Sequence, residues 1–426
     1  MPSEANCAAQ RESPQLSSLV MPTLTTWSGL PRILHLTHSL QARQGGTTEA
    51  VRQLTLGLQA LGHEQAVLSL DAPRAAGMAR LSVPVHALGA AHSGYGLTPH
   101  LLPWLRQHGV GFDAWLVHGL WQFHGLAARQ QARVQGKPYF VFCHGMLDPW
   151  FARQYPLKHL KKWLYWPWGE YRVLRDAQAV LFASDEEARL AAQSFWLYRA
   201  RAVTVGLGLA LDPAARHADP AAFLRQYPDL LGRRIVLSMA RLHPKKGGEL
   251  LLRAFAALAR EHTTLHLVMA GPDGDGYGDT LRALAAHLGI ADRVLWPGML
   301  QGAMKWSALR AAELFALPSH QENFGLAVVE ALACATPVLI SDQVNIWPQI
   351  VHAEAGWATP DTVEGTTQGL RQWLALSAAQ RSAMSGRAGL CFDDNFQLAT
   401  AAARLQAVLT GQRQLTSGRR DQLLRR

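Results

Sequence analysis

The chain has 426 residues, of which 49% are hydrophobic and 17% are charged, and its formal net charge is +10. This length favours two domains of roughly 200 residues each, with enough apolar material for a core in both. No apolar run reaches the roughly 18 residues of a transmembrane helix. Residues 1–29 are polar and lack the apolar stretch of a secretory signal, and we expect a flexible leader there.

The positive charge is unevenly distributed. Residues 1–210 hold 19 Lys and Arg against 12 Asp and Glu, an excess of +7, and residues 211–426 hold 22 against 19, an excess of +3. A basic protein can bind nucleic acid, an anionic membrane surface or a phosphorylated ligand. No nucleic-acid-binding motif is visible, so we favour the last two. The four cysteines are isolated, which argues against a disulfide framework or a thiolate zinc site, and we expect a cytoplasmic protein.

Short apolar segments alternate with longer Ala- and Leu-rich segments in both halves of the chain. The short segments are apolar along their whole length, which is typical of parallel strands covered by helices on both faces. The order predicts the α/β class, with two Rossmann-like doubly wound domains facing a cleft. The predicted strands are 32–36, 65–70, 114–118, 138–144 and 179–184, then 234–240, 265–271, 293–298, 313–319 and 337–341.

The segment that separates the two sets of strands contains Pro, Ala and Asp and predicts a linker. We therefore expect an N-terminal domain over 30–205, the linker over 206–232, a C-terminal domain over 233–395, and a final helix with a basic tail over 396–426.

Two cations follow the first strand of the second half, Arg241 and Lys246, in a glycine-containing loop that leads into a helix. Such a loop can bind phosphate, although a solvated basic loop has the same composition.

A second loop follows the strand at 313–319. If a helix begins near Asn323, its first amides point out of its N-terminus, and glycine there allows a ligand close approach. The candidate binding residues are Asn323, Phe324, Gly325 and Leu326. Glu322 then lies in the loop and Glu330 about two helical turns further on.

Glu330 is the only charged residue of the segment 325–333, and a buried carboxylate is costly without hydrogen-bond donors. A structural salt bridge is one source of donors. The hydroxyl groups of a nucleotide ribose are the other, and a diphosphate would then lie against Arg241 and Lys246.

In the first half, Gly45 and Gly46 precede an amphipathic helix, and His144 ends the strand at 138–144. An ordinary turn and a structural histidine are the alternatives, but both positions would face the same cleft. Asp273 and Asp275 form a DxD pattern set among glycines, which favours a solvated loop over a metal site. No zinc-binding motif is present among the 18 histidines, so we expect no metal.

These motifs resemble the retaining glycosyltransferases of family 4, which have the GT-B fold. The resemblance covers roughly residues 30–410 and is strongest at ARLHPKKGG (240–248), AGPDGDGY (270–277) and residues 319–342, which contain the Glu-x7-Glu signature. The segments VFCHGMLDPW (141–150) and SDQVNIW (341–347) look like the branch that builds bacterial exopolysaccharide, lipopolysaccharide and colanic-acid-type polymers.

The resemblance implies a nucleotide-sugar donor, such as a UDP- or GDP-sugar, and a glycan or lipid-linked acceptor. We expect no cofactor and no binding of nucleic acid. It also implies a role for most of the candidate residues. Arg241 and Lys246 would hold the diphosphate, Glu322 would lie by the donor sugar, and Glu330 would bind the ribose. His144 would contact the sugar–phosphate region, Gly45 and Gly46 would lie against the phosphates and acceptor, and Met299 would border the base.

The sequence departs from the family pattern in three places. Ala335 replaces a glycine, the crossing between the domains reads VGLGLALDP, and the C-terminal helix lacks a tryptophan. A catalytically degenerate sugar-binding subunit is one alternative function, and Ala335 is its only support. A nucleotide-sugar 2-epimerase of the same fold is another, but it would need acid–base carboxylates in the first domain, and none is convincingly placed there. Residues 150–175 interleave tryptophan with lysine and arginine, the composition of a membrane-interface segment, so docking on the inner membrane face is also expected; packing of the tryptophans into the first domain is the alternative.

Overall fold

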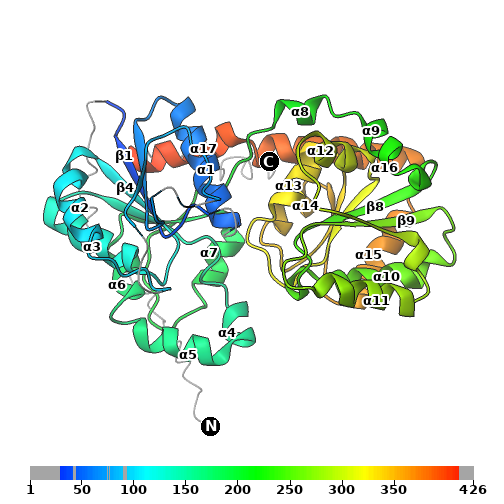
Figure 1. Cartoon of the computed structure of the whole chain (residues 1–426), viewed down its shortest axis with the longest axis horizontal. Helices are drawn as coiled ribbons and strands as arrows, with labels where there is room; N and C mark the ends of the chain where they lie inside the picture. The colour runs from blue at the N-terminus through cyan, green and yellow to red at the C-terminus, as the bar shows by residue number, and fades with distance from the viewer. Residues whose placement is uncertain (1–28, 42–44, 74, 76, 90–93, 412–426) are drawn as a thin grey trace, which may run out of the picture.

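The structure is a computed structural model that describes residues 29–41, 45–73, 75, 77–89 and 94–411. Almost all of the predicted leader, and the basic tail beyond residue 411, lie outside these ranges. The strands form two separate sheets (Figure 1), and every strand pairing within them is parallel. One sheet has the order β3-β2-β1-β4-β5-β6-β7 and the other β10-β9-β8-β11-β12-β13. The prediction of two doubly wound α/β domains is confirmed.

The strands lie close to the predicted segments. The first sheet consists of β1 (Ile33–Thr37), β2 (Gln65–Ser69), β3 (Val85–Ala87), β4 (Ala114–His118), β5 (Tyr139–Phe142), β6 (Ala179–Phe182) and β7 (Ala202–Thr204). The second consists of β8 (Arg234–Met239), β9 (Leu265–Ala270), β10 (Val294–Gly298), β11 (Leu314–Leu317), β12 (Val338–Ser341) and β13 (Gly356–Thr359).

Helices separate most successive strands, although no described helix lies between β2 and β3. The N-terminal domain contains α1 (Gly46–Ala60), α2 (Leu101–His108), α3 (Phe123–Gln135), α4 (Trp150–Gln154), α5 (Pro156–Tyr165), α6 (Glu170–Asp176) and α7 (Asp185–Ala191). The rest of the chain contains α8 (Pro213–Arg216), α9 (Pro220–Gln226), α10 (Gly248–Ala259), α11 (Tyr277–His287), α12 (Gly302–Ala311), α13 (Leu326–Ala333), α14 (Trp347–His352), α15 (Val363–Leu374), α16 (Ala378–Asn395) and α17 (Leu398–Leu409).

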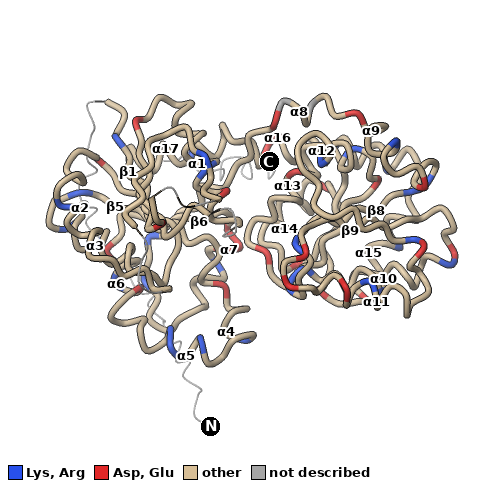
Figure 2. The backbone as a smooth tube through the Cα atoms, in the orientation of Figure 1, with Lys and Arg blue, Asp and Glu red and all other residues tan. Residues whose placement is uncertain are grey.

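The central strands are apolar because both faces of each sheet are covered. Every residue of β1, β2, β4 and β5 is buried, and Arg234 is the one Lys, Arg, Asp or Glu within the described strands. Charged residues therefore lie outside the sheets (Figure 2).

The chain crosses between the domains twice, and the two crossings lie side by side. Leu209 donates to the carbonyl of Phe396 at 2.9 Å, and Leu398 donates back to the carbonyl of Leu209 at 3.3 Å. A Cβ on Gly208 would lie 2.5 Å from the Cα of Leu398, so glycine is required for this close approach. Helix α17 then packs on α1 of the first domain (Figure 1).

Ala335 lies at the C-terminus of α13, in the left-handed region with φ 57°. Its amide donates to the carbonyl of Leu332 at 2.9 Å, and the amide of Thr336 donates to the carbonyl of Ala331 at 2.9 Å. These two bonds form a Schellman motif, whose left-handed position normally holds glycine. The alanine that replaces the family's glycine therefore keeps the turn but is strained by its Cβ.

Replacing Ala335 with glycine should remove this strain and stabilise the protein by about 1 kcal/mol. Urea denaturation of the two proteins followed by circular dichroism measures the difference. Ala353, whose φ is −79° at the end of α14, is a matched control position where glycine should destabilise. An equal loss of stability on replacing Ala335 and Ala353 with glycine would show that Ala335 is not strained.

Candidate active site

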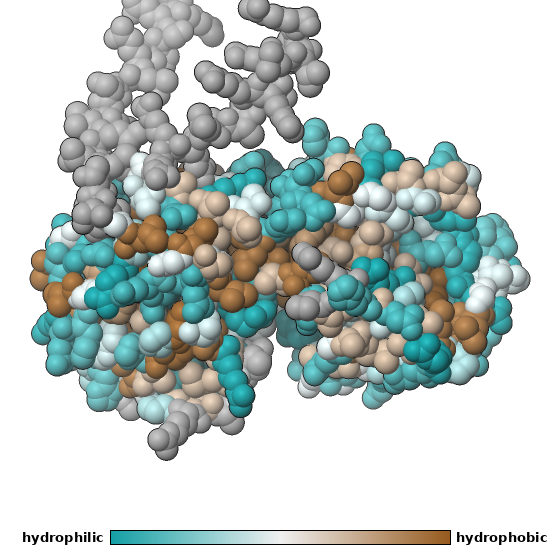
Figure 3. Space-filling model, turned by 90° about the horizontal axis from the view of Figure 1, so that it is seen from above, coloured by the Kyte–Doolittle hydropathy of each residue, from teal (hydrophilic) through white to brown (hydrophobic). Residues whose placement is uncertain are grey.

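Loops from the two domains meet where the strands of both sheets end. Gly145, after β5, lies so close to Asn323, after β11, that a Cβ on the glycine would be 2.7 Å from the Cβ of Asn323. Gln321 donates to Asp148 at 2.9 Å. The space-filling view shows the two domains as two lobes with an indentation between them (Figure 3). The carboxyl ends of the two sheets therefore face a common site, as predicted.

Glu322 and Lys246, both predicted site residues, form an ion pair in the C-terminal domain. Burial raises the pKa of the Glu322 carboxyl, but Lys246, Lys245 and the amide of Gly325 outweigh burial, and the net effect is a lowered pKa. Glu322 is therefore an anion at neutral pH. Arg241 is exposed and borders the same small pocket as Lys246.

The helix after this loop begins later than predicted. It starts at Leu326 with Gly325 as its N-cap at φ 69°, so the expected start near Asn323 is wrong by three residues. Before the helix, Glu322 forms an isolated parallel bridge with Val344: its amide donates to the carbonyl of Gln343, and the amide of Asn345 donates to its carbonyl, each at 2.9 Å.

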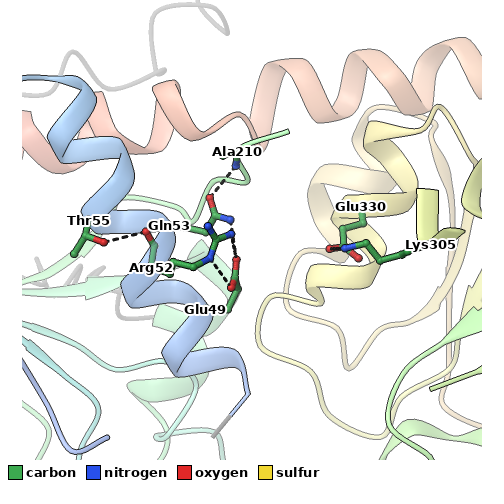
Figure 4. Close-up of polar contacts among 7 residues, drawn as sticks. All are labelled: Glu49, Arg52, Gln53, Thr55, Ala210, Lys305 and Glu330. Carbon is green, nitrogen blue, oxygen red and sulfur yellow. Dashed lines mark hydrogen bonds and ion pairs between the residues drawn. The ribbon is translucent and has the colours of Figure 1, made fainter. Parts of the chain in front are cut away.

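Glu330 lies on α13, is 6% exposed, and accepts from Lys305 of α12 at 2.7 Å. Burial raises the pKa of its carboxyl, Lys305 opposes this effect, and Glu49 adds to it. Figure 4 shows the Glu330–Lys305 pair facing α1, where Arg52 and Glu49 form an ion pair at 2.6 Å. A structural salt bridge thus supplies at least one donor to Glu330.

His144 lies two residues after β5, half-buried and in the left-handed region with φ 51°. Its ring stacks on Phe142, with ring centroids 4.5 Å apart. Burial lowers the pKa of its imidazole to about 3, so the ring is neutral at neutral pH. The next residue, Gly145, makes the contact with Asn323 described above, which places His144 at the domain junction.

The remaining predicted site residues lie at or near the ends of helices and strands in both domains. Gly45 is the N-cap of α1 with φ 65°, and Gly46 is the first residue of that helix. Met299 follows β10 and is 59% exposed. The ring of Phe324 packs against Phe396 in an edge-to-face contact at 5.9 Å, and Leu326 packs against the core of the second domain.

The structure adds residues that the sequence analysis missed. The ammonium group of Lys245 lies 5.4 Å from the ring centroids of both Trp150 and Phe151 of the other domain. Lys305 pairs with Glu330 from 25 positions away. The sequence carries no local signal for either role, since each is a common lysine whose partner is distant in the chain.

The DxD segment is part of a local turn. Asp273 accepts from the amide of Gly278 at 3.1 Å. Within the described ranges, no group of three or more His, Cys, Asp and Glu residues is placed to hold a metal ion. The described helices also include none with the length and hydropathy needed to cross a bilayer.

Comparison with known families assigns both halves of the chain. Residues 45–208 match the glycosyl transferase 4-like domain, and residues 223–391 match the glycosyl transferases group 1. These two matches indicate a GT-B glycosyltransferase of group 1/family 4. Among curated proteins, the D-inositol 3-phosphate glycosyltransferase of Mycolicibacterium smegmatis is 36% identical over 40% of this chain and 39% of its own length. That of Thermobispora bispora is 31% identical over 57% of this chain and 58% of its own. The chain thus matches about half of these relatives' length.

Solved structures share the fold. Anabaena Alr3699/HepE, crystallised in complex with UDP and glucose, has a TM-score of 0.68 at 18% identity and matches 89% of this chain and 100% of its own. WaaG, a glycosyltransferase involved in lipopolysaccharide biosynthesis, has a TM-score of 0.64 at 16% identity, with the same coverage. These similarities support the two-domain GT-B architecture.

Replacing Lys305 with methionine should destabilise the protein by about 2 kcal/mol at pH 7, because it leaves the buried Glu330 carboxylate unpaired. The variant's folded-state pKa for Glu330 is then raised further above its unfolded value. The lost stability should therefore return as the pH falls towards the unfolded pKa of about 4.3.

Urea denaturation at pH 7 and pH 5 measures this effect. The double variant with Glu330→Gln is the control and should be more stable than Lys305→Met at pH 7. An equal loss of stability at both pH values would show that Lys305 acts through packing and not through the charge of Glu330.

Proposed function

We propose that the protein is a retaining, metal-independent hexosyltransferase that moves a hexosyl group from a UDP- or GDP-sugar to a glycan or lipid-linked acceptor in cell-surface polysaccharide synthesis. The observation that carries the proposal is the meeting of the Glu322–Lys246 pair with the His144 loop, in domains that match the two transferase families. The solved neighbour with bound UDP supports the choice of donor. A phosphorylated cyclitol is the second candidate acceptor, because the curated relatives are named for D-inositol 3-phosphate.

The proposed chemistry is electrostatic. As the glycosidic bond of the donor breaks, negative charge develops on the leaving diphosphate, and Arg241 and Lys246 stabilise it. No metal is needed for this role. The acceptor hydroxyl attacks from the face of the leaving group, and a diphosphate oxygen takes its proton. Glu322, held as an anion beside Lys246, faces the positive charge that develops on the sugar. Glu330 accepts from the ribose hydroxyl groups alongside Lys305.

Glu330→Gln should weaken UDP or GDP binding about tenfold, because a neutral amide is a weaker acceptor than a carboxylate. Glu322→Gln should instead lower kcat about 100-fold with little change in nucleotide affinity. A thermal-shift screen of UDP, GDP and ADP selects the nucleotide, calorimetry gives its affinity, and turnover of the matching radiolabelled hexose donor is measured in EDTA.

Wild-type nucleotide affinity in Glu330→Gln together with full turnover in Glu322→Gln would refute both assignments. Nucleotide binding without any turnover would favour the degenerate sugar-binding subunit, and release of a 2-epimer of the sugar would favour the epimerase.

We also propose that α5 docks the enzyme on the inner face of the cell membrane. Helix α5 has no buried residue, and Leu157, Leu160 and Leu164 are 79%, 55% and 63% exposed. Their spacing puts them on one face of the helix. The lysines of α5 lie at one end of the N-terminal domain (Figure 2), and this combination of exposed leucine and lysine fits an anionic bilayer surface.

The tryptophans of this region divide into two groups. Trp166 is buried and stacks on Phe195 at 4.2 Å, so the packing interpretation holds for it. Trp163 and Trp168 are 43% and 70% exposed, and Trp196 of the neighbouring loop is 65% exposed. The ammonium group of Lys162 lies 4.5 Å from the ring centroid of Trp121, so the exposed lysines Lys158 and Lys161 are the better candidates for lipid contact.

Wild-type protein should float with anionic vesicles at low salt, and a Lys158→Glu/Lys161→Glu variant should not, since each basic residue near such a surface contributes about 1 kcal/mol. Arg253→Glu/Arg260→Glu makes the same change of charge at two exposed positions, one in α10 and one at its C-cap, and should still float. Flotation in a sucrose gradient measures binding. Equal behaviour of the two variants would refute docking through α5 and leave the transferase proposal untouched.

A further inference from the structure

Four side chains of the first domain, three on neighbouring strands and one just beyond the next strand, form a continuous line of hydrogen bonds. Nδ1 of His35 lies 2.9 Å from Nε2 of His118, and Nδ1 of His118 lies 3.0 Å from Nε2 of His144. At the other end, Nε2 of His35 lies 2.9 Å from Oε1 of Gln65, whose amide nitrogen donates to the carbonyl of Thr55 in α1 at 3.0 Å. The line crosses β2, β1 and β4 and ends just beyond β5.

The direction of every bond in this line follows from its first member. A main-chain carbonyl only accepts, so Gln65 must turn its nitrogen to Thr55 and its oxygen to His35. His35 therefore donates from Nε2, and its Nδ1 accepts from Nε2–H of His118. Nδ1 of His118 then accepts from Nε2–H of His144. Each ring carries one proton, and Nδ1 of His144 carries none.

This assignment requires neutral rings, and the burial of the histidines provides them. His35 and His118 are fully buried. Burial lowers the pKa of His35 to about 4 and that of His144 to about 3, and it lowers the pKa of His118 well below its usual value. A second proton on any ring inside the line would also turn one of its acceptors into a donor facing another donor.

The end of the line lies at the domain junction. His144 is half-buried, and the next residue contacts Asn323 beside Glu322. Its Nδ1 makes no hydrogen bond to any residue that the structure describes. An unprotonated imidazole nitrogen at this place can accept a hydrogen bond from an alcohol and cannot donate one.

We propose that Gln65, His35 and His118 are positioning residues that hold His144 in its Nε2–H tautomer, so that Nδ1 accepts from a hydroxyl group of the bound donor sugar. The selection of the sugar hydroxyl rests on the proposed transferase function, whereas the tautomer does not. The first domain would then bind a sugar hydroxyl group through a neutral acceptor, whereas the cations proposed to bind the diphosphate belong to the second domain.

Nitrogen NMR of histidine-labelled protein tests the tautomer without any substrate. Long-range proton–nitrogen correlations should show His144 protonated at Nε2 and bare at Nδ1 in the wild type. His118→Phe removes the acceptor of that proton and keeps the ring shape, so His144 should lose its single tautomer. Gln65→Leu, at the far end of the line, should have the same effect with a smaller change in the core. A proton on Nδ1 of wild-type His144 would overturn the proposal.

Kinetics tests the role of the line in catalysis. With UDP-glucose as the probe donor, His118→Phe should lower kcat/KM about tenfold while the Kd for UDP stays at the wild-type value. His118→Gln keeps one donor and one acceptor and should recover most of the loss. His63→Phe is the control, because His63 is a buried histidine of the same domain that bonds only the carbonyl of Pro31, at 3.0 Å, and it should leave kcat/KM unchanged.

The outcomes separate the two proposals. Failure of the wild type to bind UDP, with the predicted tautomer intact, would overturn the choice of donor and leave the line of histidines standing. Equal losses of kcat/KM in His118→Phe, His118→Gln and His63→Phe would show that the line serves packing alone and would overturn its positioning role.

Discussion

A carboxylate buried at the domain junction needs hydrogen-bond donors. In this protein the donors come from both domains, and they hold the two domains together. Glu187 of α7 accepts from the amide of Ala183 at 2.7 Å and from the amide of Gly145 at 2.5 Å. Burial raises the pKa of Glu187 to about 7, and these amides together with the side chain of Asn323 work against that rise. Since Asn323 belongs to the second domain, one buried carboxylate of the first domain orients the loops that carry both His144 and Glu322.

The fold could be predicted because parallel sheets impose a simple pattern on the chain. Strands covered on both faces must be apolar throughout, and the ten segments with that pattern are all strands. The sheets also contain β3, β7 and β13, which the prediction missed. All three are short edge strands whose residues are largely half-buried or exposed. Because their faces are less completely covered, these strands need not be apolar throughout. The proposed domain boundaries stay predictions.

The site could be predicted only in part. The local sequence shows which polar residues follow each strand, but the tertiary fold decides which of these residues form pairs. The cations after β8 and the carboxylate Glu322 after β11 were identified by their place at strand ends, and the structure joins Lys246 to Glu322. The partner of Glu330 was missed, since Lys305 comes from another helix. The helix start near Asn323 was misplaced because a left-handed glycine and main-chain bonds to 343–345 decide it.

The two sides of the junction differ in charge in a way that suits two parts of one ligand. The second domain places Arg241, Lys245 and Lys246 around its strand ends, and cations stabilise a diphosphate in proportion to the charge that develops on it. The first domain places His118 and His144 there, and the burial that makes them neutral also makes their hydrogen bonds stronger than in water. A protonated ring at His144 would present a donor at the place where, in the proposed function, a sugar hydroxyl group donates. Under the proposed function, the neutral rings of the first domain would bind the sugar and the cations of the second domain would bind the diphosphate, so the two parts of the donor would meet different chemistry in the two domains.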